Sequence, residues 1–142
     1  CAIGCDLTGT FFMSQQMGRH LIGAKRKGSI ISIASTHGIV GIGGISAYGI
    51  SKAGITQMTR MLAIEWAEHG IRVNAIAPGL TDTAQPRYGN TEAELALLAQ
   101  QIPLGRMGRP EEIAGLMAYL ASDQAAWITG QVYHINGGNY LA

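Results

Sequence analysis

Tyr48 and Lys52 are the residues whose types and spacing first suggest chemistry. They stand four positions apart in a stretch, residues 46–69, that has helical periodicity, so both side chains should lie on one face of a helix. A cation beside a phenol stabilises the phenolate, and such a tyrosine can donate or accept a proton near neutral pH. Ser35 precedes a glycine-rich loop that can fold its hydroxyl back beside Tyr48. Together the three residues predict an acid–base site.

Other interpretations of these residues remain open from spacing alone. A tyrosine and a lysine at this spacing also occur as an ordinary surface pair on a helix. Ser35 and Lys52 could form the nucleophile and base of a hydrolase, although this leaves the tyrosine without a role. His37 either faces a substrate or is a loop histidine satisfied by its surroundings. The four histidines, Cys1 and Cys5 show no metal-ligand spacing, so we expect no metal.

Alternating helical and strand patterns must position these residues. The sequence predicts helices over residues 8–24, 46–69 and 91–101 and from Pro110 onward. It predicts strands over residues 29–34, 71–77 and 131–135. Because strands alternate with helices, the sheet should be parallel with right-handed crossovers. Three strands are few for a doubly wound sheet, so we expect an α/β fold that is about half of one.

Several residues should end or pack these elements. The basic residues 25–27 followed by Gly28 predict a helix end with the glycine in the left-handed conformation. Gly70 should close the helix over residues 46–69 in the same way. We expect Trp66 and Trp127 to be packing residues.

Composition narrows the class of protein. A length of 142 residues is about one domain, and 47% apolar residues are too many for a disordered chain. A net charge of +1 argues against a nucleic-acid binder. The longest uncharged stretch, residues 28–51, is rich in glycine and serine, so we expect no membrane span. The low charged share favours an interface, and the few cysteines favour a reducing, cytoplasmic compartment.

The sequence resembles the short-chain dehydrogenase/reductase family. Ser35, Tyr48 and Lys52 match its Ser…Tyr-x-x-x-Lys set, and Ile-Arg-Val-Asn-Ala-Ile-Ala-Pro-Gly at residues 71–79 resembles its strand and Pro-Gly turn at the nicotinamide. Residues 104–114 and 128–138 resemble its C-terminal half, in the right order. The resemblance covers the whole chain. It is strongest to the subgroup of 3-oxoacyl-carrier-protein reductases and small sugar-alcohol dehydrogenases.

The resemblance implies a role for each matching residue. Tyr48 would be the general acid/base that passes a proton to or from the substrate oxygen. Lys52 would support the tyrosinate and hold the nicotinamide ribose, and Ser35 would hydrogen-bond the substrate oxygen.

The resemblance also implies how the cofactor, NAD or NADP, would be bound. Tyr48 and Lys52 would contact it, and Pro78, Gly79, the backbone near Thr81 and the hydroxyl of Thr83 would hold the nicotinamide ring and carboxamide. The hydride chemistry belongs to the cofactor, and the protein supplies position and protons.

Two departures from the family pattern limit what is implied. Asp6 stands where the family usually has an Asn that carries a proton relay to the lysine, so negative charge is added near Lys52. The glycine-rich dinucleotide fingerprint, which lies before the first helix in the family, has no counterpart here. Residues 41–46 fail G-x-G-x-x-G at Ser46. We therefore expect residues 1–142 to form a single partial Rossmann-type domain, the C-terminal, nicotinamide-side half of a doubly wound sheet.

The expected function is hydride transfer between NAD(P) and a secondary alcohol or ketone, without metal. The alternative is a non-catalytic nucleotide-binding or assembly module derived from a truncated dehydrogenase. Partners would be a small-molecule substrate and further copies of the chain in a homotetramer, with no nucleic acid and no membrane. Substrate specificity should lie in residues 80–101, where Arg87 and Tyr88 could meet a polar substrate.

Overall fold

The computed structural model describes residues 2–141. Its strands are β1 (Gly28–Ile33), β2 (Ile71–Pro78) and β3 (Val132–Ile135). Its α-helices are α1 (Thr10–Gly23), α2 (Ser46–Trp66), α3 (Ala84–Arg87), α4 (Glu92–Gln100) and α5 (Pro110–Ala121). A π-helical segment, η1 (Ile3–Gly9), precedes α1, and short 3₁₀ turns form η2 (Thr36–Gly38), η3 (Ala67–His69) and η4 (Asp123–Ala125). The predicted order of helices and strands is confirmed, with the single-turn α3 added.

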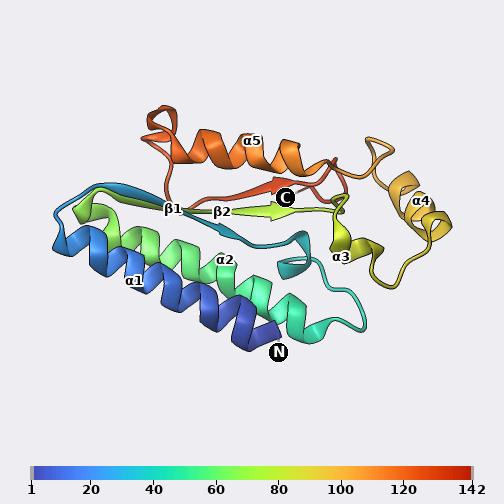
Figure 1. The fold of residues 1–142 in the computed structure, drawn as a ribbon, viewed down its shortest axis with the longest axis horizontal. Helices are drawn as coiled ribbons and strands as arrows, with labels where there is room; N and C mark the ends of the chain where they lie inside the picture. The colour runs from blue at the N-terminus through green and yellow to red at the C-terminus, as the bar shows by residue number, and fades with distance from the viewer. Residues whose placement is uncertain (1, 142) are drawn as a thin grey trace.

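The three strands form one parallel sheet in the order β1-β2-β3. Helices α1 and α2 cover one face of this sheet and α5 covers the other, which gives the three layers of a doubly wound fold (Figure 1). All three strands run toward the end of the molecule that carries α3 and α4 (Figure 1). The carboxyl ends of the strands therefore meet at that end.

The buried residues form a core on each face of the sheet. One core lies between the sheet and the helices α1 and α2, and contains Leu21, Ala34, Ile55, Met58, Leu62, Ala63, Ile71, Val73, Ala75 and Ala77. The other lies under α5 and contains Ile76, Leu120 and Ala125. The central strand β2 contributes to both, as a parallel strand buried on both faces must. The helix over residues 46–69 turns an apolar stripe, from Ile55 to Ala63, toward the first of these cores.

The end of α1 differs from the expectation. Lys25, not Gly28, adopts the left-handed conformation, with φ of 52°. The Arg26 amide donates to the Leu21 carbonyl at 2.9 Å and the Lys25 amide donates to the Ile22 carbonyl at 3.0 Å, which is a Schellman motif. Gly28 is instead the first residue of β1, where a Cβ would lie 2.5 Å from Leu21 Cδ1.

The two tryptophans also differ from each other. Trp66 packs over Gly18, where a Cβ would lie 2.7 Å from the indole ring, so the expected packing role is confirmed. Trp127 is fully exposed, with a relative exposure of 100%, so the expectation that it packs within this chain is wrong. Gly70 closes the predicted helix with φ of 69°, although the last turn is the 3₁₀ segment η3.

Asn74 is a buried polar side chain that ties β2 to the segment before β3. It has no exposed surface. Its Nδ2 donates to the Ile128 carbonyl at 2.9 Å, and its Oδ1 accepts from the Gln131 amide at 3.1 Å. One side chain thus bonds two backbone groups, of which the Ile128 carbonyl also accepts from Arg72 Nη1 at 3.3 Å.

Glu112, in the first turn of α5, gives the molecule a pH-dependent stability. Its hydrogen bonds from Arg106, at 2.8 and 2.7 Å, and from the Arg109 amide lower its pKa from 4.5 to about 2. A carboxyl whose pKa is lower in the folded state stabilises that state fully above its unfolded pKa and loses the effect as pH falls toward its folded pKa.

We expect Glu112→Gln to flatten the decrease in unfolding free energy between about pH 5 and pH 2. The measurement is urea unfolding at a series of pH values. Glu111→Gln is the matched control, because Glu111 is the exposed neighbour in the same turn and shows none of these bonds. An equal change in both variants would contradict the assignment to Glu112.

Candidate active site

The predicted site residues lie where the strands end. The Ala34 amide donates to the Ile76 carbonyl at 2.7 Å, and the Gly79 amide donates to the Ile135 carbonyl at 3.0 Å. Beyond β1, the Thr36 hydroxyl donates to the Pro78 carbonyl at 3.2 Å. The segments after β1, β2 and β3 are therefore held side by side at the carboxyl edge of the sheet, where ligands bind in open α/β folds.

Ser35 is buried at this edge, with a relative exposure of 7%. It caps the N-terminus of η2, and its Oγ accepts a hydrogen bond from the His37 amide at 3.2 Å. Because Oγ already accepts this bond, the hydroxyl hydrogen is available for donation to another oxygen.

Tyr48 and Lys52 lie in the first two turns of α2, the helix against which the turn after Ser35 packs. Lys52 Nζ lies 5.6 Å from the centre of the Tyr48 ring. It also donates a hydrogen bond to the Ile33 carbonyl at 3.0 Å, two residues before Ser35. The ammonium group thus joins the end of β1 to the start of α2.

The turn η2 contacts α2 through backbone atoms, which sequence reasoning did not predict. A Cβ on Gly38 would lie 2.8 Å from the carbonyl carbon of Lys52 and 2.9 Å from the Ala53 nitrogen. A Cβ on Gly49 would lie 3.1 Å from the His37 carbonyl oxygen. The turn after Ser35 is therefore anchored to α2 at Gly38, because only a residue without a Cβ permits this approach.

Asp6 lies in the π-helical segment η1, which packs beside α2. Its Oδ2 lies 3.4 Å from the Ser51 hydroxyl, whose hydrogen is donated to the Tyr48 carbonyl at 2.7 Å, and its main-chain oxygen accepts from the Thr10 hydroxyl. The Asp6 carboxylate thus lies beside Ser51, while the Lys52 ammonium donates to the Ile33 carbonyl. π-Helical turns are frequent at functional sites, and no sequence signal indicated this one.

The residues expected at the nicotinamide follow β2. Pro78 and Gly79 are half-buried, and the Thr81 hydroxyl donates to the Gly79 carbonyl at 3.1 Å. Thr81 also pairs with Gly108 in an isolated bridge. Thr83 is the exposed residue before α3, and its side chain makes no capping hydrogen bond there. The Thr83 hydroxyl is thus presented to solvent beyond the turn.

Arg87 and Tyr88, expected to meet a substrate, lie at the end of α3. Arg87 Nε donates to Asp82 at 2.8 Å, and its Nη1 pairs with Glu92. The hydrogen bond from Arg87 lowers the pKa of the Asp82 carboxyl. Arg87 therefore ties the segment after β2 to the start of α4. Tyr88 has a relative exposure of 89% and remains accessible.

Residues 2–141 also lack the features of two other classes of site. No group of three or more metal-ligating side chains gathers there. None of the helices described has the length and apolar character needed to cross a membrane.

Comparisons with known proteins agree with this arrangement. A family model described as enoyl-(acyl carrier protein) reductase matches residues 1–139. The 3-oxoacyl-(acyl-carrier-protein) reductase of Vibrio cholerae is 42% identical over 136 residues, which are 96% of this chain and 55% of that protein.

Solved structures superpose closely on the chain. A 4-hydroxyisoleucine dehydrogenase mutant complexed with NADH and succinate has a TM-score of 0.91 and 33% identity, over 96% of this chain and 57% of that one. A short chain dehydrogenase from Bacillus anthracis has a TM-score of 0.85 and 42% identity, over 99% of this chain and 54% of that one. The chain thus spans about half the length of the relatives it matches. From the family match, the sequence identity and the shared α/β architecture together, the chain belongs to the short-chain dehydrogenase/reductase family.

Proposed function

We propose that this protein is an oxidoreductase that transfers a hydride between NAD or NADP and a secondary alcohol or ketone, with Tyr48 as the general acid/base. The observation that carries the proposal is the position of Lys52 Nζ, 5.6 Å from the centre of the Tyr48 ring, at the strand edge that also holds Ser35. The lysine ammonium and the tyrosine ring therefore lie side by side at this edge. Such a tyrosine can protonate a developing alkoxide or accept the proton of an alcohol.

Ser35 and Lys52 complete the proposed catalytic triad with Tyr48. They would bind and orient the substrate and the cofactor. Ser35 would donate its hydroxyl hydrogen to the substrate oxygen, which its bond from the His37 amide leaves possible. Lys52 would hold the ribose hydroxyls of the cofactor while supporting Tyr48. Asp6 would stand in place of the Asn of the family, with its carboxylate beside the Ser51 hydroxyl.

The donors at the strand edge fit a nicotinamide nucleotide. The Lys52 ammonium suits a ribose diol, and the Thr83 hydroxyl suits a carboxamide. We propose that Pro78, Gly79 and the backbone near Thr81 would form the wall against the ring. When bound, the cofactor would supply or receive the hydride, while the residues of this chain position the substrate and move the proton.

The chain length bears on where the rest of the site lies. We propose that residues 1–142 form a single partial Rossmann-type domain that supplies the catalytic and nicotinamide-side half. The relatives it matches are about twice as long. A glycine turn at a helix N-terminus, which binds the pyrophosphate in Rossmann folds, would come from elsewhere in the protein. The expected compartment is the cytoplasm, consistent with the few cysteines.

The proposed function is tested by hydride transfer itself. The natural protein is incubated with a panel of ketones and with NADH or NADPH carrying deuterium at the transferable position. We expect deuterium on the carbinol carbon of a product, detected by mass spectrometry, and much slower transfer in Lys52→Ala. Absence of transfer to every ketone, together with absence of oxidation of the corresponding alcohols, would contradict the proposal.

We further propose a homotetramer, in which exposed apolar side chains become covered. Met61 and Ile64 on α2 have relative exposures of 49% and 77%, and Met13 on α1 has 73%. Apolar surface in such quantity on helical faces is typical of interfaces.

We expect light scattering to give the mass of a tetramer at micromolar concentration. Ile64→Glu should reduce the mass, because it places a charge in the covered face. Gln57→Glu on the same helix, also exposed, is the control. A monomeric natural protein would contradict this prediction.

A further inference from the structure

The helix α4 lies apart from the three layers of the fold. Figure 1 shows it beyond the carboxyl ends of the strands, in the segment where substrate specificity is expected. The start of that segment is bonded to the residues that follow it. The Gly108 amide donates to the Leu80 carbonyl at 2.9 Å, and the Asp82 amide donates to the Gly108 carbonyl at 2.8 Å. These bonds close residues 80–108 into a loop that carries α4.

The C-terminal turn, residues 136–138, holds this loop at a second place, directly after α4. The Leu104 amide donates to the Gly137 carbonyl at 3.1 Å. Gly137 also packs against Ile102, which is buried, and a Cβ on Gly137 would lie 2.6 Å from Ile102 Cγ2. The residues that leave α4 are therefore bound to the C-terminal turn.

The same turn contacts the wall proposed for the nicotinamide. The Gly79 amide donates to the Ile135 carbonyl at 3.0 Å. A Cβ on Gly79 would lie 2.7 Å from Asn136 Cβ and 2.8 Å from its Cα. The C-terminal turn thus lies between Gly79 on one side and the end of α4 on the other.

Bonds within the C-terminal segment hold the turn in shape. Asn136 Oδ1 accepts from the Gly138 amide at 3.0 Å, and Asn136 Nδ2 donates to the Tyr140 carbonyl at 2.9 Å. The Tyr140 ring lies 5.0 Å from the His134 ring on β3, centre to centre. Gly137 and Gly138 have φ of 64° and 87°, which glycine adopts without a steric cost. These contacts do not involve the loop that carries α4.

We propose that the C-terminal turn is a positioning element, with Asn136 and Gly137 as its positioning residues, that sets where α4 lies relative to the nicotinamide wall. This inference rests on the function proposed above. The turn acts on ketone binding, because it holds the segment where specificity is expected. It does not act on proton transfer, which Tyr48 and Lys52 perform from α2.

Two glycines at the two ends of β3 provide a matched pair of variants. Gly137 and Gly130 have φ of 64° and 73°, so alanine is strained to a similar extent at both. A Cβ on Gly130 would lie 3.4 Å from Ala63 Cβ, on the α2 side and away from α4. Gly137→Ala therefore disturbs the anchor of α4, and Gly130→Ala places the same strain elsewhere.

The first measurement is amide hydrogen exchange of α4, followed by mass spectrometry in the natural protein and both variants without added ligand. We expect exchange in α4 to be about tenfold faster in Gly137→Ala, the scale of one strained residue. Exchange in α4 should be unchanged in Gly130→Ala.

The second measurement is steady-state kinetics with a ketone that the natural protein reduces. Gly137→Ala and Asn136→Ala should raise KM for the ketone with kcat retained. Asn136→Asp should restore the natural KM, because its carboxylate still accepts from the Gly138 amide. A merely structural loss lowers the amount of active protein and leaves KM unchanged.

Three results overturn the inference while leaving the proposed function intact. The first is α4 exchange that rises equally in the two glycine variants, and the second is α4 exchange that rises in neither. The third is faster α4 exchange in Gly137→Ala with an unchanged KM for the ketone. A natural protein that transfers hydride to no ketone or alcohol contradicts the proposed function, and the role in ketone binding fails with it.

Discussion

Replacing Tyr48 with phenylalanine is expected to lower turnover by about 10²–10⁴-fold, the range that general acid–base catalysis contributes. The change keeps the ring that contacts His37 and removes only the hydroxyl. The measurement is steady-state NAD(P)H oxidation with a ketone that the natural protein reduces. Because the proton is transferred in the reaction step, the loss should lie in kcat.

Tyr119→Phe is the matched control for this variant. Tyr119 lies on α5, on the opposite face of the sheet from α2, and is 41% exposed (Figure 1). It should keep the turnover of the natural protein. Thermal unfolding of both variants checks that the fold is unchanged. Near-normal turnover in Tyr48→Phe would exclude Tyr48 as the acid/base.

Asn74→Leu is expected to cause the largest loss of stability, about 2–4 kcal/mol of the free energy of unfolding. The substitution removes two hydrogen bonds of a buried side chain, which leaves the Gln131 amide without this partner and the Ile128 carbonyl with only its bond from Arg72. It also places a branched side chain in a position with no exposed surface. Urea unfolding, analysed by linear extrapolation, measures the loss.

Asn90→Leu is the control for this prediction. Asn90 Nδ2 likewise donates to a carbonyl, that of Pro86, at 2.7 Å, but the residue is exposed, so water can replace the bond. We expect a change within about 0.5 kcal/mol, as for ordinary surface sites. A loss of the same size at both positions would show that burial of Asn74 is not the cause.

Local patterns predicted the elements because their causes are local. The stripe from Ile55 to Ala63 follows the helical period, and a helix must turn that stripe to the core. Thr91 and Glu94, three residues apart at the start of α4, form a capping box with both reciprocal bonds present. Gly70 ends its helix with positive φ, where an absent Cβ avoids a clash with the chain itself.

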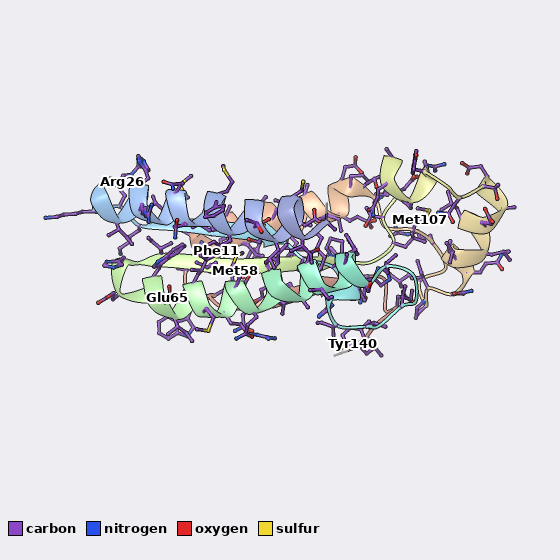
Figure 2. The ribbon with its side chains drawn as sticks, turned by 90° about the horizontal axis from the view of Figure 1, so that it is seen from below. Phe11, Arg26, Met58, Glu65, Met107 and Tyr140 are labelled. Carbon is purple, nitrogen blue, oxygen red and sulfur yellow. The ribbon has the colours of Figure 1, made fainter. Side chains whose placement is uncertain are left out.

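The end of α1 could not be predicted in this way. Lys25 adopts the left-handed conformation because the Schellman hydrogen bonds form at that residue. Gly28 lies in β1, where the Leu21 side chain leaves no room for a Cβ. This turn lies at the end of the molecule marked by Arg26 in Figure 2, opposite the end near Met107. Whether α1 ends with Lys25 or with Gly28 in the left-handed conformation depends on how the next strand packs. The periodicity of the sequence carries no information about that packing.

By itself, the sequence determined the alternation of helices and strands and the four-residue spacing that places Tyr48 and Lys52 on one helical face. Only the tertiary structure decided that Lys52 would bind the Ile33 carbonyl, that Asp6 would contact Ser51, and that Gly38 would admit the α2 backbone. These contacts join residues 14 to 45 positions apart. Helical and strand periods describe neighbours within one element, whereas such contacts arise only when separate elements pack together.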